Sequence, residues 1–191
     1  MAPAATSSPR QTQRTYAGIG SRATPPAVLE QMTRAARWLS ARGWVLRTGM
    51  ATGADQAFYR GASVHGPLEL YLPWPSFEAR ARAAIPSAEQ LVLGEPTPAA
   101  CQLAASFHPA WDRLTRAVRA LHARNCHQVL GADLESPARF VLCWTPGGSL
   151  DGHGRRVGGT GQALRIAHHH GIPVFNLARP EHLQRLADAM R

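Results

Sequence analysis

Short apolar runs alternate with amphipathic segments along most of this chain. Each run has the length of a buried strand and little polar alternation, which is typical of a parallel sheet covered on both faces. The runs are residues 15–22, 44–49, 68–73, 138–144 and 172–177. Between them lie segments whose apolar residues recur at helical spacing. These predicted helices are residues 25–43, 55–64, 110–125, 162–171 and 180–190.

The alternation of strands and helices predicts a single α/β domain over residues 15–191, with helices on both faces of the sheet. The pattern is weaker between Pro75 and Pro109. There, residues 77–85 favour a helix, residues 89–94 a short strand, and residues 95–109 carry turn signals with room for a short helix. Residues 1–14 lack a pattern and are expected to form a disordered tail.

The amino-acid composition excludes some kinds of catalytic and phosphate-binding site. The formal net charge is +9, and all 21 basic residues are arginines. Without lysine, Schiff-base catalysis and a phosphate loop of the GxxxxGK[ST] kind are excluded. Arginine suits bidentate contacts to phosphate, and the positive charge permits nucleic-acid binding without demonstrating it.

Cysteine usage and hydropathy favour a cytoplasmic protein. The three cysteines, Cys101, Cys126 and Cys143, are widely spaced and form no CxxC pair, so neither a disulfide framework nor a cysteine zinc site is indicated. No apolar run approaches the roughly 18 residues of a membrane span, and the first residues lack a secretion signal's apolar core. No membrane association is therefore expected.

Three glycine-bearing turns follow predicted strands and precede predicted helices. They are Gly18 to Arg22, Thr48 to Asp55, and Thr145 to Gly161. In a parallel sheet such turns lie at the same edge, where ligands bind. Helix N-termini attract phosphate, and glycines let the backbone approach it. The three turns together therefore predict a phosphate-binding crevice.

The segments GIGSR, GWVLRTGMATGADQAFYRGA and GGTGQALRIAHHHGIPVFNL resemble the SLOG superfamily of Rossmann-like nucleotide-binding proteins. The nearer likeness is to the Rossmann part of DNA-processing protein A (DprA/Smf) and its small stand-alone relatives. This resemblance implies a doubly wound, mostly parallel, three-layered sheet that binds a nucleotide or nucleotide derivative. The residues implied to contact the ligand are Gly18, Gly20, Ser21 and Arg22, then Thr48, Gly49, Gly53 and Asp55, then Gly158, Gly159, Thr160, Gly161 and Gln162.

Another branch of that superfamily, the LOG phosphoribohydrolases, cleaves nucleotides with a glutamate in a PGGxGTxxE motif. Here Arg165 stands where that glutamate would fall. An N-glycosidase is therefore the alternative hypothesis, with Asp55 as its candidate catalytic carboxylate. The other role for Asp55 is to cap the following helix.

Several further expectations accompany these. Trp144 either stacks on a base or packs in the core. The loop from Pro146 to Gly158, which includes Arg155 and Arg156, is either a phosphate-gripping lid or a mobile basic loop. No metal site is predicted, because the consecutive histidines 168–170 point in different directions. No cofactor is predicted either. Single-stranded DNA is a second possible partner, and the resemblance implies a homodimer.

Overall fold

A computed structural model describes residues 13–85, 90–154 and 157–191 of the chain. Residues 1–12 of the expected tail, and the two arginines of the expected lid, lie outside the described residues. In chain order the elements are β1 (Thr15–Gly20), α1 (Pro26–Ser40), β2 (Val45–Thr48), α2 (Ala54–Ala62), β3 (Leu68–Tyr71), α3 (Ala79–Ala83), β4 (Gln90–Leu93), α4 (Pro98–Ser106), the 3₁₀ turn η1 (Trp111–Arg113), α5 (Arg116–Leu130), β5 (Val141–Trp144), α6 (Thr160–His169), β6 (Val174–Asn176) and α7 (Pro180–Ala189).

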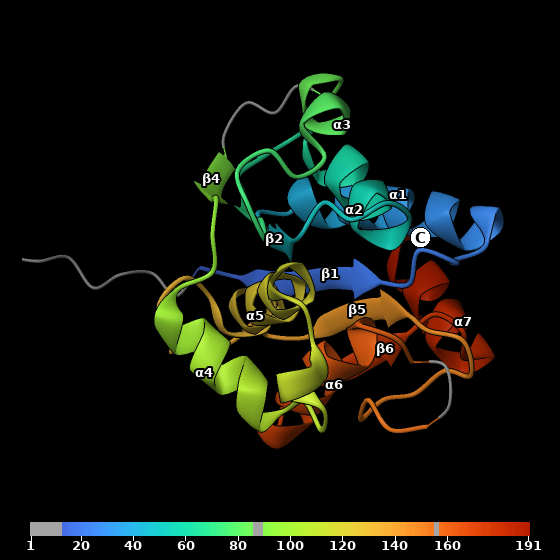
Figure 1. Cartoon of the computed structure of the whole chain (residues 1–191). Helices are drawn as coiled ribbons and strands as arrows, with labels where there is room; N and C mark the ends of the chain where they lie inside the picture. Colours follow the sequence, from blue (N-terminus) through green and yellow to red (C-terminus); the bar gives the residue numbers. More distant parts are fainter. Residues whose placement is uncertain (1–12, 86–89, 155–156) are drawn as a thin grey trace, which may run out of the picture.

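The strands form one parallel sheet in the order β4-β3-β2-β1-β5-β6 (Figure 1). The chain builds outward from β1 to β4, then returns to place β5 on the other side of β1. In the register of that central pair, Gly20 lies beside Trp144. This arrangement confirms the predicted Rossmann-like, doubly wound fold. It also sets a topological switch point between β1 and β5, where such sheets bind ligands.

Two apolar cores lie on opposite faces of the sheet. One contains residues of α1 and α2, with α7 packed against it, and the other contains residues of α4, α5 and α6. Figure 1 shows α1 and α2 on one side of β1 and α5 on the other. Strand β1 serves both cores, since Tyr16 belongs to the first while Ala17 and Ile19 belong to the second. None of the helices in the described ranges is long and apolar enough to span a membrane.

Local sequence explains most element boundaries, with one instructive exception. Helix α1 begins at Pro26, as predicted, because proline tolerates the first helical turn. The helix predicted over residues 110–125 is displaced. Its first residues form η1, and α5 begins after Thr115, whose hydroxyl accepts a hydrogen bond from the Val118 amide (3.4 Å). It then runs on to Leu130 and ends at Gly131, which has a φ of 88°.

Candidate functional site

A pocket of about 390 Å³ lies at the carboxyl end of β1, at the switch point. Four segments line it: the turn after β1, the start of α2, the start of α6, and one face of α5. The lining residues are Ile19, Gly20, Ser21, Arg22, Ala51, Asp55, Val118, Leu121, His122, Arg124, Asn125, Gln128, Val157, Gly158, Gly159, Thr160 and Ala163. All three predicted glycine turns thus contribute to one pocket, and α5 adds a fourth wall that was not predicted.

The turn after β1 places a free arginine at the pocket. Ser21 stabilises the turn, because its hydroxyl accepts from the Ala23 amide (3.1 Å) and its carbonyl accepts from the Thr24 hydroxyl (2.7 Å). Arg22 lines the pocket, is exposed, and makes no ion pair within the described part of the chain. Its positive charge reaches Arg124, whose pKa it helps to lower. An anion between these two groups would relieve their repulsion.

Three residues of the second turn support the pocket from behind. The Thr48 hydroxyl donates to the Gly18 carbonyl (2.8 Å) and ties β2 to β1. Gly49 lies against Arg124, which donates to its carbonyl. Gly53 has a φ of 94°, and a Cβ there would lie 2.9 Å from the Arg22 Cα. Glycine at this position therefore permits α2 to start close to the first turn.

Asp55 and Arg124 form a buried ion pair on the pocket floor. Asp55 Oδ2 lies 3.4 Å from Arg124 Nη2, and the two residues are 3% and 6% exposed. The same oxygen accepts from the amide of Ala51, which precedes α2 (3.3 Å). Burial raises the pKa of the Asp55 carboxyl, and the Arg124 charge opposes that rise. The carboxylate is thus engaged by its own neighbours.

The third turn presents a helix N-terminus to the pocket. Gly158, Gly159 and Thr160 line the cavity, and α6 begins at Thr160 with neither a side-chain cap nor an acid in its first turn. Gly161 is absent from the lining, and a Cβ there would lie 2.6 Å from Val157. Gln162 is fully buried beneath the pocket and is absent from its lining.

The polar face of α5 is the part of the site that the sequence prediction missed. His122, Asn125 and Gln128 recur at a spacing of three, line the pocket, and are buried. The Gln128 side chain hydrogen-bonds to Asp55 and lowers the pKa of that carboxyl. Arg124 Nε is buried without a hydrogen-bond partner among the described residues, and because an unsatisfied donor of this kind is costly, it points to a ligand acceptor. The signal was present in the sequence, but the predicted helix ended at Asn125.

Seven of the predicted contacts do not line the pocket: Gly18, Thr48, Gly49, Gly53, Trp144, Gly161 and Gln162. Gly18 lies within β1, where a Cβ would meet Leu46 at 2.6 Å and Phe58 at 2.7 Å, so it serves packing between the sheet and α2. Trp144 lies at the end of β5 and packs against the core on the α1 and α2 face. The described residues lining the pocket include no tryptophan, tyrosine or phenylalanine.

Arg165, at the position of the LOG glutamate, serves the neighbouring loop. Its Nε donates to the Phe107 carbonyl (3.0 Å) and its Nη1 to the Gly152 carbonyl (2.9 Å). In that loop Asp151 caps a tight turn, accepting from the His153 amide (2.9 Å). Among the described residues, no cluster of histidine, cysteine or acidic side chains forms a metal site.

No protein-family model and no curated protein matches this chain. Solved structures with a similar fold include DNA processing protein A from Helicobacter pylori, reported for its unique single-stranded DNA binding mode. It is 13% identical, with a TM-score of 0.45, over 93% of this chain and 80% of that one. DprA from Streptococcus pneumoniae is also 13% identical, with a TM-score of 0.39, over 84% of this chain and 57% of that one. Both TM-scores and both sequence identities are low, so we infer function from the geometry of the site. Membership of the SLOG superfamily stays a prediction.

Proposed function

We propose that the pocket binds a nucleotide or a nucleotide derivative through its phosphate. The observation that carries this proposal is the N-terminus of α6, which has no side-chain cap and forms one wall of a pocket that also contains Arg22, an arginine without an ion pair among the described residues. The first amides of a helix and its dipole attract anions. A guanidinium adds a planar pair of donors suited to phosphate oxygens.

The charges of the two helix starts favour α6 over α2 as the phosphate site. Both helices begin after a glycine that provides no side-chain cap. In α2, however, Asp55 already lies in the first turn as an internal anion, and it is paired with Arg124. Helix α6 has no acid in its first turn. A ligand phosphate would therefore be repelled from α2 and attracted to α6.

The rest of the pocket suits a sugar and a base. Its volume of about 390 Å³ falls in the range typical of small-molecule sites. Ile19, Val118 and Leu121 supply apolar surface, while Gln128 supplies a buried amide. Since the described lining lacks a large aromatic ring, base recognition would depend on aliphatic contact and hydrogen bonds.

The carboxylate arrangement supports binding more than cleavage. Hydrolysis of an N-glycosidic bond needs a carboxylate that stabilises the cationic sugar or activates water. Asp55 is the one carboxylate among the described lining residues, and its ion pair with Arg124 and the Ala51 amide occupy it. Arg165 cannot replace the missing glutamate. The N-glycosidase therefore stays the alternative, with Asp55 as its candidate.

A thermal-shift panel tests the proposal. Ribonucleoside and deoxyribonucleoside monophosphates, cyclic nucleotides and NAD-derived molecules should include at least one compound that raises the unfolding temperature, since a ligand of the folded state stabilises it. The matching nucleosides without phosphate should have little effect. Chromatography of each hit then separates binding from cleavage: intact nucleotide supports the proposal, and released base supports the glycosidase. A panel without any phosphate-dependent shift would refute both.

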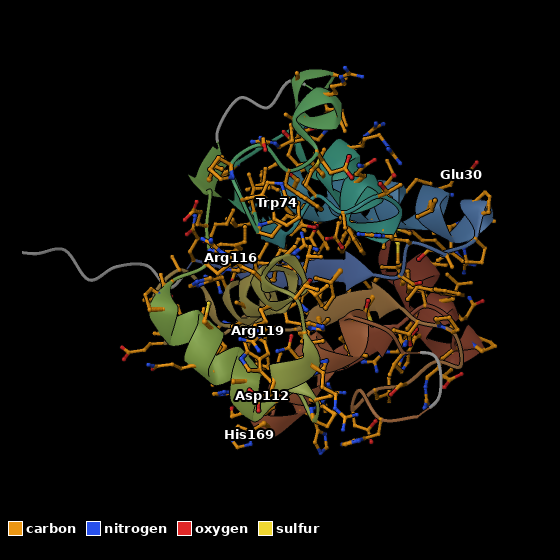
Figure 2. The ribbon with its side chains drawn as sticks, in the orientation of Figure 1. Glu30, Trp74, Asp112, Arg116, Arg119 and His169 are labelled. Carbon is orange, nitrogen blue, oxygen red and sulfur yellow. The ribbon has the colours of Figure 1, made fainter. Side chains whose placement is uncertain are left out.

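Single-stranded DNA is a second candidate, favoured by the net charge of +9 and by arginines at the start of α5. Arg116 is exposed at the first residue of α5, and Arg113 is exposed in η1 just before it; Figure 2 shows Arg116 and Arg119 on α5. Phosphate contacts along a strand would make oligonucleotide affinity fall steeply with salt concentration. A flat salt dependence, with mononucleotides binding equally well, would exclude this mode. The expected homodimer also stays a prediction, which sedimentation velocity would test.

A further inference from the structure

The hydrogen bonds around His122 determine which of its ring nitrogens carries the proton. Gln162 Nε2 donates to the Ala104 carbonyl (3.1 Å), so Gln162 Oε1 must accept. Asn125 Nδ2 donates to that oxygen (3.2 Å) and also to the Gly159 carbonyl (3.2 Å). His122 Nδ1, 3.1 Å from the same oxygen, must therefore be protonated. Neutral His122 then carries its lone pair on Nε2.

This Nε2 is available to the pocket. The His122 ring lines the cavity, and its Nε2 makes no hydrogen bond within the described part of the chain. The ring also lies beside the start of α6, because a Cβ built on Gly159 would be 3.9 Å from His122 Cε1. An anion bound at this helix start would thus contact Nε2. As a lone pair, Nε2 would repel an anionic oxygen, whereas a protonated Nε2 would donate to it.

The burial of His122 and the charges around it favour the neutral form of its ring when the site is empty. Burial lowers the pKa of His122, and the hydrogen bond from its ring to Gln162 opposes this change. Three basic groups lower the pKa further: His108, whose ring centroid is 4.6 Å away, Arg165 of α6, and Arg124 of its own helix. Across the pocket lie Arg22 and Asp55.

We propose that His122 takes up a proton from solvent when a phosphate binds at the start of α6, and thereby selects a terminal phosphomonoester over a phosphodiester. This inference rests on the proposed function. Because Asp55 balances Arg124, the uncompensated charge among the described lining residues is Arg22 alone when His122 is neutral. Protonation of His122 adds a second positive charge, which matches the dianion of a phosphomonoester. A phosphodiester carries one charge and matches the neutral state.

Linkage gives the sign of the pH dependence. Above the His122 pKa of the complex, neither form of the protein holds the extra proton. Between the lowered pKa of the empty site and the raised pKa of the complex, affinity for the phosphate dianion should increase about tenfold for each unit by which the pH falls. Below the pKa of the empty site, the affinity for the dianion should become constant. The affinity for total AMP should fall short of this below about pH 6, because the phosphate itself then takes up a proton.

Two measurements on the wild-type protein test this. Imidazole NMR, with the His122 signals assigned from the spectrum of His122→Gln, should give a higher His122 pKa with saturating AMP than without it. Calorimetry with AMP at about pH 7.5, where the second ionisation of a phosphomonoester (near pH 6) is almost complete, should show uptake of up to one proton in buffers of different ionisation enthalpy. The methyl ester of AMP should bind more weakly, without proton uptake.

Variants identify the titrating group. His122→Gln should bind AMP with no proton uptake and with a smaller preference over the methyl ester. His108→Gln tests the neighbouring ring, and His169→Gln, on the last residue of α6, serves as the matched control; both should retain uptake. This inference is wrong, and the proposed function stands, if AMP binds while the His122 pKa is the same with and without AMP and the binding heat does not depend on the ionisation enthalpy of the buffer. If neither AMP nor any other phosphate compound binds at any pH, the proposed function itself fails.

Discussion

Gly159 offers the sharpest test of where the phosphate lies. Its backbone has φ −62° and ψ −29°, an ordinary helical conformation, so a side chain would introduce no strain there. The residue is exposed, and the nearest atom to a Cβ would be His122 Cε1 at 3.9 Å. The change Gly159→Asp therefore adds a negative charge at the proposed phosphate site without crowding the fold.

The magnitude follows from two opposing effects on this helix start. A carboxylate near a helix N-terminus should raise the free energy of unfolding by about 0.3–1 kcal/mol. The same carboxylate about 5 Å from a phosphate dianion would repel it by roughly 1.7–6.6 kcal/mol, taking effective dielectric constants of about 80 down to 20. Even the lower value corresponds to a loss of about 15-fold in affinity. The variant should thus become more stable and bind more weakly.

Thermal unfolding and calorimetry with the strongest-binding nucleoside monophosphate measure both quantities. Gly159→Asn is the matched control, because asparagine has nearly the shape of aspartate without its charge. The asparagine variant should bind close to wild type. Wild-type affinity in both the aspartate and the asparagine variant would refute a phosphate at the start of α6. Equal loss in both would show that the space beside Gly159, and not its charge, matters.

Three further changes test the scaffold around the pocket. Asp55→Asn leaves Arg124 buried without its carboxylate and should lower the free energy of unfolding, measured by urea titration, by about 3–5 kcal/mol. A loss below about 1 kcal/mol would mean that the pair behaves like a surface ion pair. Burial lowers the pKa of His127, so the imidazole binds a proton more readily in the unfolded chain than in the folded protein. The free energy of unfolding should therefore fall on acidification below about pH 6.5, by at most about 1.4 kcal/mol per pH unit for this one group. His127→Gln should reduce that slope, and an unchanged pH profile would contradict the assignment. Gly53 has a φ of 94° and a crowded Cβ position, so Gly53→Ala should lower the free energy of unfolding by about 1–3 kcal/mol. Gly147 has a φ of 85° but open space around its Cβ position, so Gly147→Ala should lower it by less. Equal decreases in unfolding temperature for the two variants would show that crowding contributes nothing.

The polar face of α5 shows why part of the site escaped prediction. A helix face with His122, Asn125 and Gln128 looks solvent-exposed when only its own sequence is considered, because such side chains are seldom buried. In the folded protein that face closes the crevice opposite α6. The Asn125 amide finds a partner in the Gly159 carbonyl, and the His122 imidazole finds one in the Gln162 side chain. Those partners are distant in sequence, so local pattern could not reveal them.

The sequence by itself determined the parallel sheet, its helical layers and the three glycine turns at one edge, because strand length, helical periodicity and turn chemistry are local properties. Tertiary structure alone decided which turn residues reach the cavity. It directed Trp144 and Gly18 to the α2 side of the sheet, and Asp55 to Arg124. It also brought α5 over the switch point between β1 and β5. The physical reason is that a side chain's role there depends on the charges and atoms that face it, and these come from segments that only the packing of the whole chain brings together.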